Sequence, residues 1–306
     1  MPLLKIGSSG PEVEKLQRRL SALGFEPGGA DGRFSMRTDV AVRDFQASAG
    51  LADDGIVGAL TWEALFPTRA EGDQARAPSP RVTSTSHPGF LAPLIENHNF
   101  NGGVRWRLAS DGIRIAGAAP ETTRGEPQTV ARVWRDFGRP IKLWAGRFDV
   151  PVELIVATIC TESRGDSAVL RKEPGYISDE QTPHKVSPGL MQTLISTARE
   201  TLGDNSIDRE WLLDADNSIR AGTAYIDRQR RKTKLDPPKV ACAYNAGSVI
   251  AKNGVGNRWK TKQFPIGTGK HADRFVEWFN DCFRFFEQRD ITPPVSFRDR
   301  LLRRAR

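Results

Sequence analysis

Apolar residues recur at helical spacing in three stretches near the start of the chain. A proline opens the first stretch and a glycine follows it, which is typical of helix ends. The second runs from about residue 35 to 48, and the third from about 60 to 66. Their inward stripes are Val13, Leu16, Leu20 and Leu23, then Val42, Phe45 and Ala49, then Trp62 and Leu65. This periodicity predicts a compact three-helix module over residues 1–66.

Two Asp-Gly turns, Asp31-Gly32 and Asp54-Gly55, precede the second and third of these helices. Asp-Gly is a strong turn signal. The two turns form a weak internal repeat. Residues 67–88 follow, rich in Pro, Ser, Thr and Arg and poor in apolar side chains. This composition predicts a flexible linker, which as a random coil would span roughly 25 Å.

The pattern changes after the linker, and residues 89–290 read as a second domain. Alternating residues on either side of Asp111-Gly112 predict a β-hairpin. Helical patterns follow at about 128–147, 151–164, 195–202, 216–232, 237–246 and 271–288. The fold class expected for the whole chain is therefore mainly α (α+β), with one small hairpin. Residues 291–306 form a basic C-terminal tail.

Charge is unevenly distributed along the 306 residues, whose net charge is +8. Residues 1–66 carry seven Lys/Arg and nine Asp/Glu, so the remainder carries +10. A basic body suggests an anionic polymer as target: nucleic acid, bacterial wall or lipopolysaccharide. The basic residues are scattered and no nucleic-acid motif is present, so no specific nucleic acid is expected as a partner.

Neither metal nor cofactor is expected from the sequence. Cys160, Cys242 and Cys282 lack metal-site spacing, and we expect small buried hydrophobes there. The four histidines include no His-x-x-x-His pair, which argues against a zinc peptidase. The first residues lack the apolar core of a signal peptide, and no stretch is long enough to cross a bilayer. The expectation is synthesis in the cytoplasm, with another exit route for work at a cell wall.

Glu162 is the leading candidate for chemistry. It ends a run in which Pro151 fits the first helical turn and Gly165 fits the end. Ile155, Ile159 and Glu162 are spaced i, i+4, i+7, which places the carboxyl on the apolar stripe. Burial raises the pKa of a carboxyl, and one still protonated near neutral pH can act as a general acid. The alternative is a Glu that caps the helix or pairs with Arg164.

Three later segments add to this candidate. They are Ser187-Pro188-Gly189-Leu190-Met191-Gln192-Thr193, Gly222-Thr223-Ala224-Tyr225-Ile226 and Ala241-Cys242-Ala243-Tyr244-Asn245-Ala246-Gly247. Each also has a structural interpretation alone: a gap-filling Met, a core aromatic and a helix C-terminus.

Residues 5–66 resemble the peptidoglycan-binding module of many wall hydrolases. Ser35 departs from it, since the family often has Gly there. The residues that match are Gly7, Gly10, Val13, Leu16, Gln17, Leu20, Gly24, Asp31, Gly32, Phe34, Thr38, Ala41, Val42, Phe45, Gln46, Gly50, Leu51, Asp54, Gly55, Val57, Gly58, Thr61, Trp62 and Leu65.

Glu162-Ser163 and the three later segments, in this order, resemble the catalytic domain of soluble lytic transglycosylases and goose-type lysozymes. The resemblance covers about 150 to 285 and implies a lysozyme-like fold that cleaves peptidoglycan glycan strands. It implies that Glu162 is the acid for the bond between N-acetylmuramic acid and N-acetylglucosamine. It also implies that substrate is bound by Ser163, Met191, Gln192, Tyr225, Tyr244 and Asn245.

An insertion between Glu-Ser and Gly-Leu-Met-Gln looks like one found in phage lysins. Of its carboxylates, Glu173, Asp179 and Glu180, Glu173 is the best second carboxylate, although it could instead pair with Arg171 or Lys172. A hydrolase that delivers water uses two carboxyls. A lytic transglycosylase can use one, giving a 1,6-anhydromuramic end. We favour the transglycosylase and keep the hydrolytic muramidase as the alternative.

The modular order resembles a phage endolysin acting on a Gram-negative wall as a monomer. Such a protein would be released to the wall by a separate membrane-permeabilising protein. The basic tail could bind anionic lipopolysaccharide, or it could be a solvated terminal helix. A non-enzymatic wall-binding or virion structural protein would keep the first module without needing Glu162.

Overall fold

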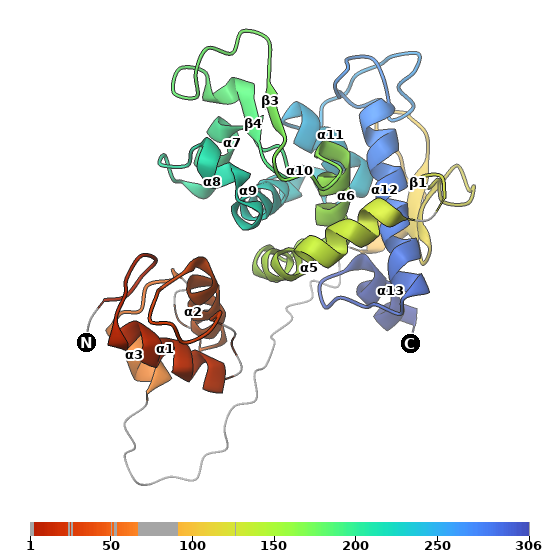
Figure 1. Cartoon of the computed structure of the whole chain (residues 1–306). Coiled ribbons are helices and arrows are strands. Elements are labelled where there is room, and N and C mark those ends of the chain that lie inside the picture. The colour runs from red at the N-terminus through yellow and green to blue at the C-terminus, as the bar shows by residue number, and fades with distance from the viewer. Residues whose placement is uncertain are drawn as a thin grey trace. The chain divides into compact units, whose positions relative to one another are not determined.

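The computed structural model describes residues 3–23, 25, 27–49, 51, 54–66, 91–125 and 127–305, with backbone only at 47, 48 and 305. The chain divides into two compact units, one on each side of residue 85 (Figure 1). The predicted linker at 67–88 and the matched glycines at 24 and 50 lie outside the described residues.

The first unit contains α1 (Pro11–Ala22), α2 (Met36–Ser48) and α3 (Ala59–Leu65). These elements confirm the three predicted helices. Leu23 and Ala49 are exposed, contrary to the inward positions expected from spacing, because each follows the last turn of its helix. The buried core consists of Leu4, Val13, Leu16, Leu20, Phe34, Ala41, Val42, Phe45, Val57, Trp62 and Leu65.

Two buried glutamines make the internal repeat of this unit stronger than its turns suggested. The Nε2 of Gln17 donates to Asp31 Oδ1 and Thr38 Oγ1, and its Oε1 accepts from the N–H of Gly32. In the second half of this unit, Gln46 makes the equivalent set of hydrogen bonds. Its partners are Asp54 Oδ1, Thr61 Oγ1 and the N–H of Gly55. Each buried amide is thereby satisfied, and each Asp-Gly turn is fixed to a helix.

The second unit begins with α4 (Ala92–Ile95) and a hairpin of β1 (Trp106–Ala109) and β2 (Gly112–Ile115). The strands are antiparallel, with Trp106 opposite Ile115. The N–H of Ile113 donates to Asn280 Oδ1 of α12 (Lys270–Gln288) at 2.7 Å. This bond attaches the predicted hairpin to the helical body.

The remaining helices of the second unit follow the predicted order. They are α5 (Gln128–Phe148), α6 (Val152–Glu162), α7 (Ile195–Leu202), α9 (Ala215–Arg228), α11 (Pro237–Ala246) and α12. Periodicity missed the short α8 (Arg209–Leu213), and the helix predicted at 216–232 is divided into α9 and α10 (Arg230–Thr233). Periodicity also missed β3 (Leu170–Lys172) and β4 (Val186–Pro188), which pair antiparallel and are joined through the 3₁₀ turn Pro183–Lys185.

Helix α6 is the centre of the second unit, packed against α5, α9, α11 and α12 (Figure 1). Every residue from Val152 to Thr161 is buried. Two threonines inside it return their hydroxyls to the backbone one turn earlier: Thr158 to Leu154 O and Thr161 to Ala157 O. Gly165 has φ +84, and a Cβ there would lie 2.8 Å from Val133 Cγ2. The chain must therefore leave the end of α6 through a glycine.

The C-terminal segment is attached to this core. Helix α13 (Phe297–Ala305) follows α12, and Phe297 is fully buried. The carboxylate of Glu153, in the first turn of α6, accepts from the N–H of Phe297 and the N–H of Arg298, each at 3.0 Å. The predicted tail thus contains a helix whose first turn is anchored on α6.

Candidate active site

A cavity of about 770 Å³ opens in the second unit beside the end of α6. We call it the Glu162 cavity. Its walls come from the ends of α6 and α11, the β3 segment, α9, the loop before α12 and the first turns of α12. It is lined by Thr161, Glu162, Arg171, Glu173, Ser187, Gln192, Thr193, Leu194, Thr197, Tyr225, Tyr244, Asn245, Ala246, Gly247, Phe264, Pro265, Lys270, His271 and Arg274.

Glu162 is the last residue of α6, and its side chain is 9% exposed. Burial raises the pKa of this carboxyl to about 7, against the lowering effect of Arg171 and Arg274. The nearest cation atom is Arg171 Nη1, 4.0 Å from Glu162 Oε2. That is a long ion pair from a guanidinium that is itself half exposed, so it offsets only part of the desolvation. A large fraction of Glu162 therefore stays protonated near neutral pH.

His271 was missed by sequence reasoning. Its Nε2 lies 3.7 Å from Glu162 Oε1, and its side chain is 11% exposed. Burial, together with Arg274 and Arg171, lowers the pKa of His271 to about 4. The imidazole is therefore neutral near pH 7 and does not force Glu162 to ionise. His271 lies in the first turn of α12, over a hundred residues along the chain from Glu162, so only the fold could pair them.

Tyr244 lines the cavity and is held in place through its hydroxyl group. Its hydroxyl donates to the carbonyl of Met191 at 2.9 Å and lies 2.8 Å from Thr193 Oγ1. Burial raises the pKa of this phenol well above its usual value. A Cβ at Gly222 would lie 2.5 Å from Met191 Sδ and 2.8 Å from Tyr244 Oη. Only glycine on α9 lets these side chains pack there.

Two of the predicted substrate-binding residues do not line the cavity. Met191 is fully buried in the apolar core. The hydroxyl of Ser163 donates to Ile159 O and accepts from the N–H of Gly165, and so closes the end of α6. In the structure both residues support the cavity from behind.

Gln192, Asn245 and Tyr225 line the cavity as expected. The amide of Gln192 is already engaged, since it donates to Val169 O and Gly189 O and accepts from Ser187 Oγ. Asn245 Oδ1 accepts from the N–H of Phe264 at 2.5 Å, which ties α11 to the loop before α12. The ring of Tyr225 meets that of Tyr244 edge-on at 5.3 Å.

Of the three insertion carboxylates, only Glu173 lines the cavity. Asp179 instead pairs with Arg209 at 2.8 Å and accepts from the hydroxyl of Tyr176. Glu180 is exposed. The structure therefore brings Glu162, Glu173, Gln192, Tyr225, Tyr244 and Asn245 to one cavity.

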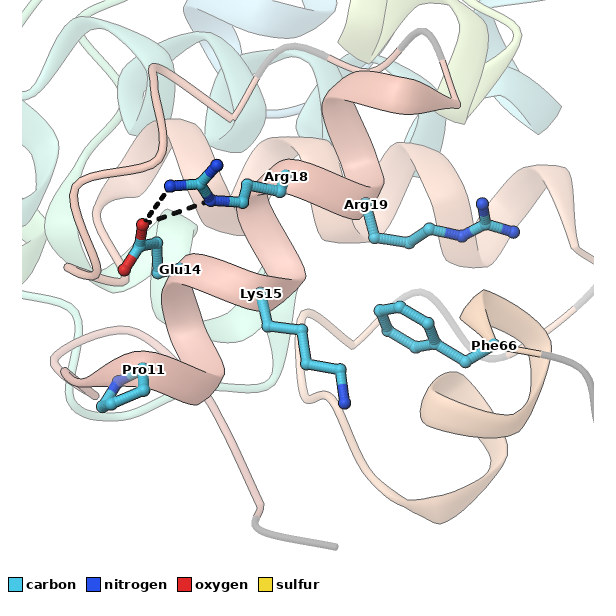
Figure 2. Close-up of a pocket in the computed structure, with 6 residues that line it drawn as sticks. All are labelled: Pro11, Glu14, Lys15, Arg18, Arg19 and Phe66. Atoms are coloured by element: carbon cyan, nitrogen blue, oxygen red, sulfur yellow. Dashed lines mark hydrogen bonds and ion pairs between the residues drawn. The ribbon is translucent and has the colours of Figure 1, made fainter.

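A second cavity, of about 460 Å³, lies in the first unit between α1 and the end of α3. Figure 2 shows Lys15 and Arg19 beside the ring of Phe66, with their cationic groups 5.1 and 5.6 Å from its centroid. Arg19 Nε also donates to Leu65 O, and Arg18 pairs with Glu14. The arginines of this cavity thus already bind groups of their own domain.

The cysteines of the second unit are free and buried. Over the described part of the chain, no group of three His, Cys, Asp or Glu is placed to hold a metal ion. The same residues contain no helix long and apolar enough to span a bilayer.

Two domain families match the chain. The family described as a putative peptidoglycan binding domain matches residues 9–65, and the transglycosylase SLT domain family matches residues 139–265. The chain carries a peptidoglycan-binding domain and an SLT domain. The second match contains Glu162, Gln192, Tyr225, Tyr244 and Asn245 and stops before α12, so His271, Lys270 and Arg274 lie beyond it.

Curated relatives match over part of their length. N-acetylmuramoyl-L-alanine amidase CwlL of Bacillus licheniformis is 43% identical over 88 residues, 28% of this chain and 24% of that protein. The spore cortex-lytic enzyme of Bacillus cereus is 32% identical over 130 residues, 41% of this chain and 49% of that protein. The chain thus spans between a quarter and a half of these relatives.

Two solved structures also resemble the chain. The Burkholderia AP3 phage endolysin gives a TM-score of 0.31 at 16% identity, over 93% of this chain and all of that one. An inactive mutant of the lytic transglycosylase Slt from Pseudomonas aeruginosa gives 0.34 at 18%, over 55% of this chain and 25% of that one. Neither score is high enough to establish a shared fold.

Proposed function

We propose that this protein cleaves the glycan strand of peptidoglycan at the β-1,4 bond between N-acetylmuramic acid and N-acetylglucosamine, with Glu162 as general acid. The observation that carries the proposal is a carboxyl 9% exposed, with a pKa raised to about 7, on a cavity of about 770 Å³. A cavity of this size suits a segment of a sugar chain. The two domain families support a wall polymer as substrate.

In the first step, the protonated carboxyl of Glu162 gives its proton to the glycosidic oxygen, and the bond from C1 of the muramic acid to that oxygen breaks. The N-acetylglucosamine leaves as an alcohol, and positive charge develops at C1. In the second step, the Glu162 carboxylate takes the proton of the muramic acid's own C6 hydroxyl as that oxygen bonds to C1. The product is a 1,6-anhydromuramic end, and Glu162 is again protonated.

The alternative is a hydrolytic muramidase. It is favoured by one observation, the presence of Glu173 on the same cavity. A second carboxylate could activate a water to attack C1 from the opposite face, which leaves a reducing muramic end. Glu173 is exposed to solvent, whereas Glu162 is nearly buried, so the two carboxyls of the cavity differ in their surroundings.

Mass spectrometry of digested peptidoglycan separates the two outcomes. We expect mostly anhydromuramic ends, lighter by one water than reducing ends, from both wild type and Glu173→Gln. Reducing ends from wild type that disappear in Glu173→Gln would replace the transglycosylase with the muramidase. A protein that binds wall sacculi without releasing soluble fragments would instead be a non-enzymatic wall-binding protein.

We further propose a monomeric endolysin of phage type that acts at the cell wall. The first unit would hold the wall while the second cleaves nearby, which raises the effective concentration of substrate. The basic face of α13 would add attraction for anionic lipopolysaccharide. Arg303 and Arg304 lie in its last turn, and Leu302 is 43% exposed.

A further inference from the structure

Three cationic side chains line the Glu162 cavity, and no described carboxylate lies closer than 4.0 Å to any of them. Lys270 and Arg274 are exposed and four residues apart on α12, so they share a face of the helix. Neither side chain makes a hydrogen bond or an ion pair with any described residue. Arg171 on β3 is 52% exposed, and its ion pair is the 4.0 Å contact with Glu162. The cavity therefore holds more positive charge than its own groups neutralise.

This arrangement is unfavourable without a ligand. Like charges spaced i, i+4 on a helix repel each other. Arg171 and Arg274 also lower the pKa of Glu162, which works against a group that must keep its proton. A bound anion would remove both effects. The other lining anion, Glu173, is one carboxylate against three cations.

The substrate itself can supply an anion to this cavity. If the proposed function is right, the carboxylates nearest the cleaved bond hang from the lactyl ether of the muramic acid. We infer that Arg171, Lys270 and Arg274 form a carboxylate subsite for this substituent, either the lactyl carboxylate itself or those of the first residues of the attached peptide. The inference rests on the proposed function and adds charge selectivity to it.

Occupation of the subsite would also tune the acid. Glu162 faces Arg171 from β3, His271 and Arg274 from α12, and Tyr244 from α11. His271 and Tyr244 are uncharged near neutral pH. A carboxylate on the two arginines would cancel their effect, so the pKa of Glu162 should be higher in the complex than in the free enzyme. The strand that carries the right charge would thus help to keep the acid protonated.

The experiment compares three strands of equal length: peptide-bearing, peptide-free with a lactyl carboxylate, and peptide-free with that carboxylate converted to a methylamide. The kcat/KM of the full chain is measured on each. We expect wild type to lose about tenfold on the methylamide strand relative to the better charged strand, as for one charge-assisted hydrogen bond. Which charged strand is better identifies the source of the carboxylate.

Variants assign the effect to the cations. In the double variant Lys270→Gln/Arg274→Gln, the ratio of kcat/KM on charged strands to kcat/KM on the methylamide strand should fall below about twofold. The variant Arg274→Lys should retain most of the wild-type ratio. Arg289→Gln, which removes an exposed cation beyond the other end of α12, should keep the wild-type ratio. The pH profiles of the wild type give a further readout. The pKa that governs the alkaline fall of kcat should be higher than the pKa that governs the alkaline fall of kcat/KM, and only on charged strands.

The outcomes separate this inference from the proposed function. Equal wild-type rates on charged and methylamide strands would overturn the subsite and leave glycan cleavage intact. A double variant that slows equally on all three strands would also overturn it, because its cations would then act without regard to substrate charge. A wild type that cleaves none of the strands would refute the proposed function itself.

Discussion

Two glutamates at opposite ends of one helix have the same rise in pKa but different surroundings. Glu153 lies in the first turn of α6 and Glu162 is its last residue. They are nine residues apart, which places them on opposite faces of the helix and about 13 Å apart along its axis. Burial raises the pKa of each to about 7. Glu153 accepts from two backbone N–H groups of α13, whereas Glu162 meets an open cavity.

The comparison teaches that a raised pKa does not by itself identify a catalytic acid. The oxygens of Glu153 are occupied by the first turn of α13, so no ligand can reach them without removing that helix. The oxygens of Glu162 line a cavity, and Arg171 and His271 lie 4.0 and 3.7 Å from them, beyond hydrogen-bond distance. Access, more than the pKa, separates the two roles.

The largest effect is expected from Glu162→Gln. The amide keeps the shape of the side chain but has no acidic proton, so the rate of glycan cleavage should fall on the order of 100-fold to 10,000-fold. Release of soluble fragments from purified sacculi measures the rate. The variant should melt at or above the wild-type temperature at pH 8, because it removes a carboxylate that is costly to bury.

Wild-type lytic rate in a folded Glu162→Gln protein would refute the assignment of the acid. The matched control is Glu153→Gln on the other end of α6. Measured per folded molecule, this control should keep its activity within about twofold, since its site is independent of the cavity.

The next effect is on stability, from Glu153→Ala. It leaves two N–H groups at the start of α13 without their acceptor, one buried and one partly buried, and an unsatisfied buried group costs about 1–3 kcal/mol. Urea unfolding should show a loss of a few kcal/mol, with early release of α13 detected by faster hydrogen exchange at Phe297. Unchanged stability would mean that α13 is not held by this contact.

The pH dependence of that loss has a definite sign. The folded-state pKa of Glu153 is about 7 against an ordinary value of 4.5, so the folded chain binds this proton more tightly. The stabilising contribution of this proton is complete below pH 4.5 and is lost as the pH rises to 7, and each pH unit across that range removes about 1.4 kcal/mol. Glu153→Ala should therefore destabilise more at pH 4.5 than at pH 7.5.

The smallest effect is expected from Arg171→Gln, which acts on one glutamate and not the other. Wild-type kcat/KM should fall tenfold per pH unit above about 7, as Glu162 loses its proton. Without Arg171, the pKa of Glu162 should rise, and the alkaline limb should move to higher pH by less than about one pH unit. Arg171→Lys is the control that keeps the charge. A limb that moves to lower pH would contradict the electrostatic account.

Local sequence was sufficient for most elements of the fold. The helical stripes of α1, α5, α6 and α12 and the Asp-Gly hairpin at 111–112 were predicted close to their observed bounds. Periodicity works there because each element turns one apolar face to a core. It failed for α8 and the β3–β4 pair, which are too short to repeat a pattern, and it merged α9 and α10 into one helix.

For the candidate site, motifs in the sequence pointed to Glu162 and the segments around it, while the fold decided which side chains reach the cavity. Met191 and Ser163 lie in matching motifs, yet they support the cavity from behind. His271, Lys270 and Arg274 belong to no motif, yet they line it. Spacing along the chain does not record which atoms of distant elements face one another.

The sequence by itself determined the modular order, the helices and the placement of Glu162 on an apolar stripe, because these depend on neighbours within a few residues. Only the tertiary structure decided that Glu162 is open to a cavity and Glu153 is closed by a helix. Both glutamates are buried by the same core, and the difference between them comes from segments more than a hundred residues away, α12 in one case and α13 in the other. Desolvation sets the proton affinity of each, and the packing of those distant segments determines whether a substrate can reach the proton.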